Sequence, residues 1–593
     1  MQTVSQDWKN NQKELLTTES FVEVILTLTD PDAYQDATAT DNGAIHISNT
    51  NQTVSEVDKN VVPYVTLEPN LWLLDGSRKI IPKANYGDCG YIGNVLSNNK
   101  GVFTTIPMLT VNFSQIHRKL IQGVTITWGL AHKEYAVDFT VTAYNGNTVL
   151  GTKTVTGNED IKSVVKMDIV DYDRITISVS KWCLPYRRAR IEEILTGVEL
   201  VYSKQDLFSF SHSQEVDPIS ASLPKSEISF SIDNSDNSYN PNNLDSYAKY
   251  LMERQEIRVR YGYKIKNDVE WIKCGTFYIS EWDAPQNGMV ADFTARDLLE
   301  FMTDNYYEGL YNPNGTSLYN LAVDVLTKAN LPLDEDGSVK WVLDNSLKNI
   351  YTVAPLPIDT LANCLQLIAN AGGCVIYQDR NGVLHIEKMV ISETDYDISL
   401  FNSYSKSGIT LSKPLKQVNV PCYSYSISQD TTELYKGTVN ISGTEELLIS
   451  YSGSATNVVA NVSGGTLNSA TYYTNACKLK ITATGNVTIT ITGNSLESSS
   501  VIVVTDSGLT GETITVDNPL VTSNDRAVAI GTWVESYMKN RMVLSSSWRA
   551  DPRLDALDMV DNENDYNINK VIMTNVNYKY NGAFRGSGEG RVM

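Results

Sequence analysis

The feature that most constrains the fold is a repeated alternation of apolar and polar residues in short runs. Residues 21–30, 174–180, 256–265 and 486–493 show it clearly. A period of two is typical of β-strands that bury one face, and the Asn-Gly and Thr-Gly pairs between such runs are hairpin signals. The sequence therefore predicts a mainly β protein with some α+β structure, and at 593 residues it is long enough for three to five domains.

Three segments break this alternation and show the spacing of an amphipathic helix. They are residues 316–332, 358–373 and 523–541. In the first, apolar residues recur at i, i+3, i+4, i+7 and i+8 from Leu318, and Pro332 follows. Gly372 and Gly373 supply a stop for the second helix, and Ser523 or Asn524 can cap the third. We expect these helices to pack on sheets in a framework that other modules interrupt.

Two stretches of different composition predict inserted modules. Residues 76–204 form a compact run of alternating strands that ends in a basic turn, and residues 441–522 are rich in Ser, Thr, Gly and Val and nearly free of Lys and Arg. Both patterns are typical of small all-β sandwiches. Domains are inserted where the two ends of the insert lie close together at a surface.

Charge and composition exclude several kinds of protein. Asp and Glu number 69 against 48 Lys and Arg, for a formal charge of −21, which disfavours tight binding of duplex DNA. No apolar run reaches the roughly 18 residues needed to span a bilayer. The first twenty residues lack the basic start and apolar block of a signal peptide, so we expect synthesis and folding in the cytoplasm.

The sequence carries no recognisable catalytic or metal-binding motif. The seven cysteines are scattered without a CxxC pair, and the five histidines have no metal-ligand spacing. Asp233, Ser235 and Asn237 alternate as in a calcium loop, but Ser238 and Leu244 stand where the loop needs Gly and Glu, so Asx turns leading into a short helix are favoured. We expect no metal, no cofactor and no enzymatic activity. The glycine-rich end, residues 585–590, is predicted to be a flexible tail.

An ordered set of signals in residues 205–300 resembles the tail hub, or baseplate hub, family of long-tailed bacteriophages and related injection devices. The residues that carry the resemblance are Asp217-Pro218, Leu223-Pro224, Asp233-Asn234, Tyr239-Asn240-Pro241, Tyr261-Gly262, Gly275, Phe277-Tyr278, Trp282 and Ala295-Arg296-Asp297. The later framework agrees with it through Arg549, Asp551-Pro552-Arg553, Leu557 and Asp558. The resemblance covers the framework, about three fifths of the chain, and it names no reactive residue.

The resemblance implies β-barrel-like hub domains that trimerise into a ring continuing the tail tube. It divides the chain into residues 1–75 and 205–300 as hub domain 1, 301–440 as hub α+β domains and 523–593 as the C-terminal part of the hub. The inserts are then a carbohydrate-binding-like sandwich at 76–204 and an Ig-like or sandwich decoration at 441–522. Two similar domains per chain in a homotrimer would match a sixfold tube.

The first insert resembles the sugar-binding sandwiches embedded in phage tail proteins. Such sites stack an aromatic ring on the apolar face of a pyranose and place polar groups at the rim. The candidates are Trp128, Tyr135, Trp182, Tyr186 and Arg188. Each of them also has a structural interpretation: Trp128 falls in mid-strand and can be core, and the arginines of the basic turn can pair with carboxylates.

The leading interpretation is a structural hub at the virion tail tip. It would contact distal tail, tube and other tail-tip proteins, let DNA pass without specific binding, and help attachment to a bacterial surface glycan. The alternative is a receptor-binding adhesin whose sandwiches carry the function, although no heptads or collagen-like repeats predict a stalk. A tail lysin is a third class, for which an active site could hide only in the first insert.

Overall fold

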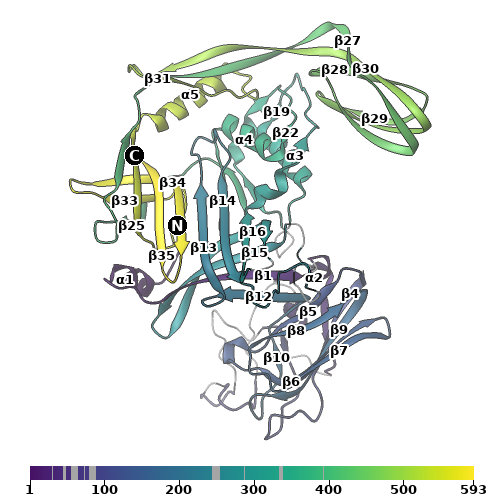
Figure 1. The fold of residues 1–593 in the computed structure, drawn as a ribbon, viewed down its shortest axis with the longest axis vertical. Coiled ribbons are helices and arrows are strands. Elements are labelled where there is room, and N and C mark those ends of the chain that lie inside the picture. Colours follow the sequence, from purple (N-terminus) through teal and green to yellow (C-terminus); the bar gives the residue numbers. More distant parts are fainter. Residues whose placement is uncertain are drawn as a thin grey trace.

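The computed structural model of the chain describes residues 1–29, 31–43, 48–54, 65–72, 74–78, 89–243, 247, 251, 254–285, 288–332, 338–390 and 393–593. Over these residues the protein is mainly β and multidomain, as the alternating runs predict. Figure 1 shows a central sheet, a β module at one end of it, an α+β unit beside it and a long β arm across the other end.

The framework is a single sheet of thirteen strands with the order β12-β1-β15-β16-β17-β14-β13-β34-β35-β32-β26, while β33 pairs with β34 and β25 pairs with β33. The first half comprises β1 (Ser20–Thr29), β12 (Gly197–Ser203), β13 (Leu207–Glu215), β14 (Lys225–Asp233), β15 (Glu256–Ile265), β16 (Asp268–Asp283) and β17 (Val290–Arg296). The second half comprises β25 (Glu393–Ile398), β26 (Gly408–Leu411), β32 (Met542–Arg549), β33 (Met559–Glu563), β34 (Ile568–Tyr580) and β35 (Phe584–Val592).

The two halves of the sheet meet where β13 pairs with β34, a junction we call the seam. The pairing is antiparallel and runs in register from Phe210 opposite Tyr580 to Glu215 opposite Asn575. Buried side chains from both halves, from Val22 in β1 to Phe584 in β35, form one hydrophobic core. The seam therefore makes the two halves a continuous structure with a shared interior.

Strand β35 corrects the prediction of a flexible C-terminal tail. It pairs with both β34 and β32. A Cβ added at Gly586 would lie 2.7 Å from the Trp548 ring, and one at Gly588 would lie 2.3 Å from the Asn575 carbonyl oxygen. The glycines are thus required by close packing against neighbouring strands rather than by chain flexibility.

The first module is built on two sheets that enclose a separate core. One sheet has the order β2-β4-β9-β6-β7 and the other β11-β5-β8. The bounds are β2 (Thr38–Asp41), β4 (Met108–His117), β5 (Ile121–Thr127), β6 (Ala136–Asn145), β7 (Thr148–Val155), β8 (Lys162–Ile169), β9 (Tyr172–Trp182) and β11 (Glu193–Leu195), with α2 (Pro31–Asp36) beside them and β3 (Tyr91–Ile92) paired with β10 (Arg190–Ile191).

The strands of this module run from residue 38 to residue 195, whereas the composition predicts an insert at 76–204. β2 is a short polar strand without alternation, but it pairs with β4 inside the module. β12 alternates like its predecessors but pairs with β1 of the framework. Thr29 lies opposite Gly197 in that pairing, so the module is inserted between two adjacent antiparallel strands.

The three helices lie where their spacing predicts. α3 (Leu318–Ala329) begins after the Ser317 cap, α4 (Leu361–Gly372) ends at Gly373 in the left-handed conformation, and α5 (Asn524–Met538) begins after Ser523. They share a core with the small sheet of β20 (Trp341–Leu343), β24 (Leu384–Glu387) and β23 (Val375–Gln378). Two-stranded pairs join β18 (Asn305–Tyr306) to β22 (Asp359–Thr360) and β19 (Thr316–Ser317) to β21 (Tyr351–Thr352).

A long hairpin, which we call the arm, spans residues 415–515. Its two main strands are β27 (Leu415–Ser450) and β30 (Ala476–Asp506), and its other strands are β28 (Ala455–Ser463), β29 (Thr466–Tyr472) and β31 (Glu512–Thr515). The change of composition predicts a second insert that begins at residue 441, but β27 continues through that position without a turn. In Figure 1 the base of the arm lies over α5 and its tip bends back toward the α+β unit.

A row of glycines crosses the arm at the position where it bends. Gly443, Gly464 and Gly485 all have positive φ, of 100°, 92° and 144°. Gly443 pairs with Ala483, and a Cβ on Gly464 would lie 2.7 Å from the Asn486 carbonyl oxygen, so the three glycines are neighbours on adjacent strands. Glycine allows this backbone conformation at no steric cost. The distal part of the sheet can therefore fold over its own aliphatic core.

Candidate functional site

The outer face of the central sheet carries rows of small hydroxyl side chains across the seam. In β13 and β14 the residues Phe210, His212, Phe230 and Ile228 point inward and are buried, and the serines between them face outward. One row runs across five strands, and each member lies opposite the next in the strand register. Its members are Arg585, Lys579, Ser211, Ser229 and Thr294.

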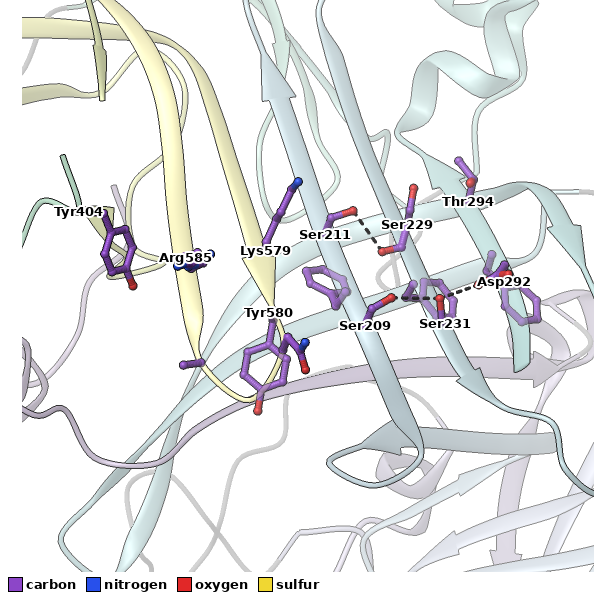
Figure 2. Close-up of a pocket in the computed structure, with 15 residues that line it drawn as sticks. Ser209, Ser211, Ser229, Ser231, Asp292, Thr294, Tyr404, Lys579, Tyr580 and Arg585 are labelled. Carbon is purple, nitrogen blue, oxygen red and sulfur yellow. Dashed lines mark hydrogen bonds between the residues drawn. The ribbon is translucent and has the colours of Figure 1, made fainter. Parts of the chain in front are cut away.

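A second hydroxyl row lies beside the first and is linked by hydrogen bonds. Ser209 Oγ donates to Ser231 Oγ at 3.0 Å, and Ser231 Oγ donates to Asp292 Oδ1 at 2.5 Å. Figure 2 shows this chain of side chains running away from the cationic end of the cavity. The two rows form the floor of a cavity of about 610 Å³, and Tyr404, Tyr580, Asn581 and Ala583 also contribute to its lining.

Beneath this cavity the interior holds a cluster of titratable side chains. His212 Nδ1 lies 3.1 Å from Tyr261 Oη, and the Cys274 thiol donates to the same oxygen at 2.9 Å. Burial, together with the Arg380 guanidinium, lowers the pKa of His212 to about 3, and burial raises the pKa of Cys274 to about 12. A reactive cysteine needs a lowered pKa and access to solvent. His212 and Cys274 therefore contribute to core packing, and they are not suited to act as a base and a nucleophile.

Residues 549–558, which we call the clasp loop, join distant parts of the framework. Trp8 Nε1 donates to Asp551 Oδ1 at 3.0 Å, and Tyr396 Oη donates to the Asp551 carbonyl oxygen at 2.8 Å. Arg380 Nε donates to Asp555 Oδ1 at 2.6 Å, and Arg553 Nε donates to Asp551 Oδ2 at 2.6 Å. Asp551 thus connects the N-terminal segment and β25, and Asp555 connects the β23–β24 hairpin to the same loop.

Two of the five predicted sugar-contacting residues are core residues of the first module. Trp128 is 0% exposed and Trp182 is 1% exposed, and their rings meet edge to face at 6.1 Å. The Trp128 indole donates to Ser163 and the Trp182 indole donates to Glu134, both at 2.8 Å. Neither ring presents a face on which a pyranose could stack, so the structural interpretation of these two residues holds.

The other three predicted residues do not form one surface with the tryptophans. Tyr135 is half-buried against the module core, while Tyr186 is 50% exposed. Arg188 Nε lies 3.7 Å from Glu68 Oε2, and its Nη1 donates to the Gly93 carbonyl oxygen at 3.0 Å. Of the five, Tyr186 is the residue most available to a ligand, and its contact with a sugar stays a prediction.

The basic turn is held by two buried carboxylates. Glu68 accepts two hydrogen bonds of 2.8 Å from Arg190, and Glu134 pairs with Arg187 at 3.0 Å. Burial alone would raise the pKa of Glu68, but the adjacent Arg190 guanidinium holds it below its usual value. Arg187 and Arg190 of this turn are therefore neutralised by carboxylates of the same module.

Two other sequence features raised as sites are the cysteines and the Asp/Asn-rich stretch near Asp233. Among the residues that the structure describes, no disulfide joins any of the seven cysteines. The backbone N–H of Ser235 donates to Asp233, and that of Ser238 donates to Asp236, as Asx turns do. The helix expected next falls on residues that are mostly outside the described ranges. Within the described ranges, no group of three or more His, Cys, Asp or Glu could hold a metal ion, and no helix is long and apolar enough to cross a membrane.

The hydroxyl rows were not identified from the sequence. The signal that could have found them is the serine at every second position in residues 209–213 and again in residues 229–231. That spacing places all of these serines on one face of a strand. Their alignment across β13, β14 and β17 depends on the strand register, and the approach of β34 from the far end of the chain depends on topology.

Comparisons with known proteins give distant structural matches. No family model matches the sequence, and no curated protein matches it. Among solved structures, the 43 kDa tail protein of prophage MuSo2 from Shewanella oneidensis is 11% identical with a TM-score of 0.37, over 66% of this chain and 95% of that protein. The tail protein from Neisseria meningitidis MC58 is 9% identical with a TM-score of 0.36, over 66% and 93%.

A third match has the same character. The prophage tail protein gp18 from Listeria monocytogenes EGD-e is 9% identical with a TM-score of 0.34, over 67% of this chain and 91% of that protein. Each of these three proteins is described as a tail protein. Scores this low carry no inference about what this chain does, so its function has to be argued from its own residues and geometry.

Proposed function

We propose that this protein is a non-enzymatic structural component of a phage tail or a related injection device, and that three copies form the hub ring at the tail tip. The observation that carries the proposal is the seam. It joins two half-sheets, of seven and six strands, edge to edge within one chain. Three such chains would present six sheet units around an axis, which suits a junction with a sixfold tube.

The family motifs support this proposal because they lie in the framework and not in the modules. Asp551 and Arg553 belong to the clasp loop, Tyr261 is buried beneath the cavity, and Asp297 caps the short helix Leu298–Met302 that leads into the α+β unit. These residues hold the two half-sheets and the α+β unit together. The formal charge of −21 favours passage of DNA without specific binding, because like charges repel.

The test is the mass and symmetry of the purified full chain, followed by imaging with tail tubes. We expect a particle of three times the 65.8 kDa chain mass, with threefold averages that show a ring. The ring should cap tail tubes in negative-stain images. A monomer at all concentrations, or molecules on slender appendages away from the tube axis, would refute the hub.

The adhesin alternative has one structural observation in its favour. The first module has its own core and is inserted between β1 and β12, whose ends Thr29 and Gly197 are register partners. Replacing residues 30–196 with an Asn-Gly turn should therefore leave a β1–β12 hairpin and an intact framework. If the variant still trimerises but no longer binds host cells, the module carries attachment to a surface glycan. If cell binding is unchanged, the interpretation of this module as an adhesin is excluded.

A further inference from the structure

Two cations stand side by side at one end of the cavity on the outer face of the sheet. Lys579 lies directly opposite Arg585 in the pairing of β34 with β35, and both side chains are exposed. Among the residues that the structure describes, neither has a carboxylate partner. Like charges directly opposite each other destabilise a sheet, and here they persist in a chain with a strong excess of acid. This arrangement favours an anionic group as their partner.

The hydroxyl rows lead away from these cations across the sheet. From Arg585 the first row crosses Lys579, Ser211 and Ser229 to reach Thr294, each one strand further. At a strand spacing of about 4.8 Å the row is about 19 Å long. Each serine or threonine hydroxyl is both a donor and an acceptor, which matches the hydroxyl groups of a saccharide.

The charge distribution selects between a saccharide and a nucleic acid. Both cations lie at one end of the cavity, and Asp292 lies at the other end (Figure 2). A nucleic acid carries one phosphate per nucleotide along its whole length, so its distal phosphates would approach the Asp292 carboxylate. A short saccharide with a single acidic sugar at one end would leave neutral hydroxyl groups there.

The rim supplies an aromatic surface at the cationic end. Tyr404 is 52% exposed, and the Arg585 guanidinium lies 5.0 Å from its ring centroid. Aromatic rings bind the apolar face of ligands whose other groups are polar. The cavity volume of about 610 Å³ falls in the range of sites for small ligands.

We propose that this cavity binds an oligosaccharide that ends in a carboxylate-bearing sugar. Arg585 and Lys579 bind the carboxylate, Tyr404 packs on that sugar, and the hydroxyl rows bind the neutral sugars that follow. The site lies in the framework, outside the first module, and it does not depend on the formation of a trimer.

The test is calorimetric titration of the full chain with 3′-sialyllactose and with a trisaccharide that ends in glucuronic acid. We expect at least one of them to bind, and lactose to bind at least tenfold more weakly, because charge-assisted hydrogen bonds exceed neutral ones. Arg585→Ala and Lys579→Ala should each weaken binding about tenfold or more, and Ser229→Val should weaken it severalfold. Lys436→Ala, which removes an exposed lysine of the arm, is the matched control and should bind as the parent does.

Several outcomes would overturn the proposal. Failure of both acidic trisaccharides to bind at millimolar concentration would do so, as would equal binding of lactose. A hexathymidylate that binds more tightly than the trisaccharides, and that is weakened by the same two alanine variants, would identify a nucleic-acid site instead. Because Lys579 is exposed, Lys579→Gln keeps the test valid if Arg585→Ala does not fold.

Discussion

The central sheet and the arm are both made of long antiparallel strands, but they are held together in opposite ways. In the central sheet the clasp loop joins residues as far apart in sequence as Trp8 and Asp551, which are 543 positions apart. In the distal arm the core comes from residues 434–491, where β27 pairs with β30 as one long hairpin, while Leu415, Val418 and Val420 at the base of the arm pack into the core of the α+β unit. The framework is thus held together by non-local polar contacts, and the distal arm by strand pairing around a core of its own.

This difference indicates which region of the protein can be altered without unfolding the rest. A unit whose core is contiguous in sequence can unfold or be changed by itself, because few contacts cross its boundary. A unit that is held together by contacts between distant parts of the chain is expected to lose those contacts in one cooperative step. Hydrogen exchange resolved by peptide is therefore the measurement that separates the two regions, since it reports local free energies of opening.

The largest effect is expected from Asp551→Ala in the clasp loop. The variant leaves Trp8 Nε1 and much of the buried Arg553 guanidinium without their acceptor. Removing one member of a buried ion pair costs about 3 to 5 kcal/mol. Hydrogen exchange should accelerate in β13, β34 and the N-terminal segment and stay unchanged in the β28 and β30 peptides. Equal acceleration in the arm would break the comparison.

A pH-dependent effect is expected at Asp297, between the central sheet and the α+β unit. Burial raises the pKa of this carboxyl to about 7, from 3.8 in the unfolded chain. The folded state therefore holds its proton more tightly, and stability falls as the pH rises from about 4 to 7. Asp297→Asn can still accept the Leu299 N–H, which Asp297 does at 3.0 Å.

We expect Asp297→Asn to unfold at a higher temperature than the parent at pH 8 and to lose that advantage at pH 4. Thermal unfolding followed across this range tests it. The arm core is aliphatic apart from Cys477, so exchange of arm peptides should show no matching change. An advantage of the variant that is the same at every pH would contradict the assignment to Asp297.

A smaller effect, confined to the arm, is expected from Gly464→Ala at the bend. The residue has φ of 92°, and the new Cβ would lie 2.7 Å from the Asn486 carbonyl oxygen. Backbone strain of this kind costs about 1 to 3 kcal/mol. The matched control is Gly453→Ala, where a Cβ meets nothing within 4 Å, and it should change stability by less than about 0.5 kcal/mol. Loss of protection in the central sheet would show that the arm is not independent.

The smallest effect is expected where the arm touches the α+β unit. Lys478 Nζ lies 2.9 Å from Glu308 Oε1, and the lysine side chain is 30% exposed. Ion pairs at a surface contribute about 0 to 1 kcal/mol. Lys478→Ala should therefore shift the midpoint of thermal unfolding only slightly more than the control Lys480→Ala, an exposed lysine on the same strand. A large shift would mean that the arm and the framework unfold as one unit.

Local patterns in the sequence were sufficient for some elements and not for others. The helix near Leu318 and the Asx turns near Asp233 follow from signals within a few residues, and both lie where they were expected. Strand β35 was missed because its glycines resemble a flexible tail, and the reason for them is the contact of Gly586 with Trp548 on another strand. Such close approaches are invisible in a local window.

The same distinction applies to the sites. Trp128 and Trp182 were proposed for sugar contact from residue type, but Trp128, which follows β5, and Trp182, the last residue of β9, are both buried in the module core. The pairing of Lys579 with Ser211 joins residues more than 360 positions apart and cannot be read from either segment alone. Sequence patterns thus predicted which face of a strand is buried, while identification of the cavity required the order of the strands in the sheet.

The seam also determines how the molecule would carry mechanical load. Its hydrogen bonds run across the strands, so tension that separates the two halves sideways would open the bonds between Phe210 and Glu215 one after another. Tension along the strands would instead stretch all of them together, which is the more resistant geometry. The direction of the applied tension therefore determines whether the two half-sheets separate at low force or resist as a unit.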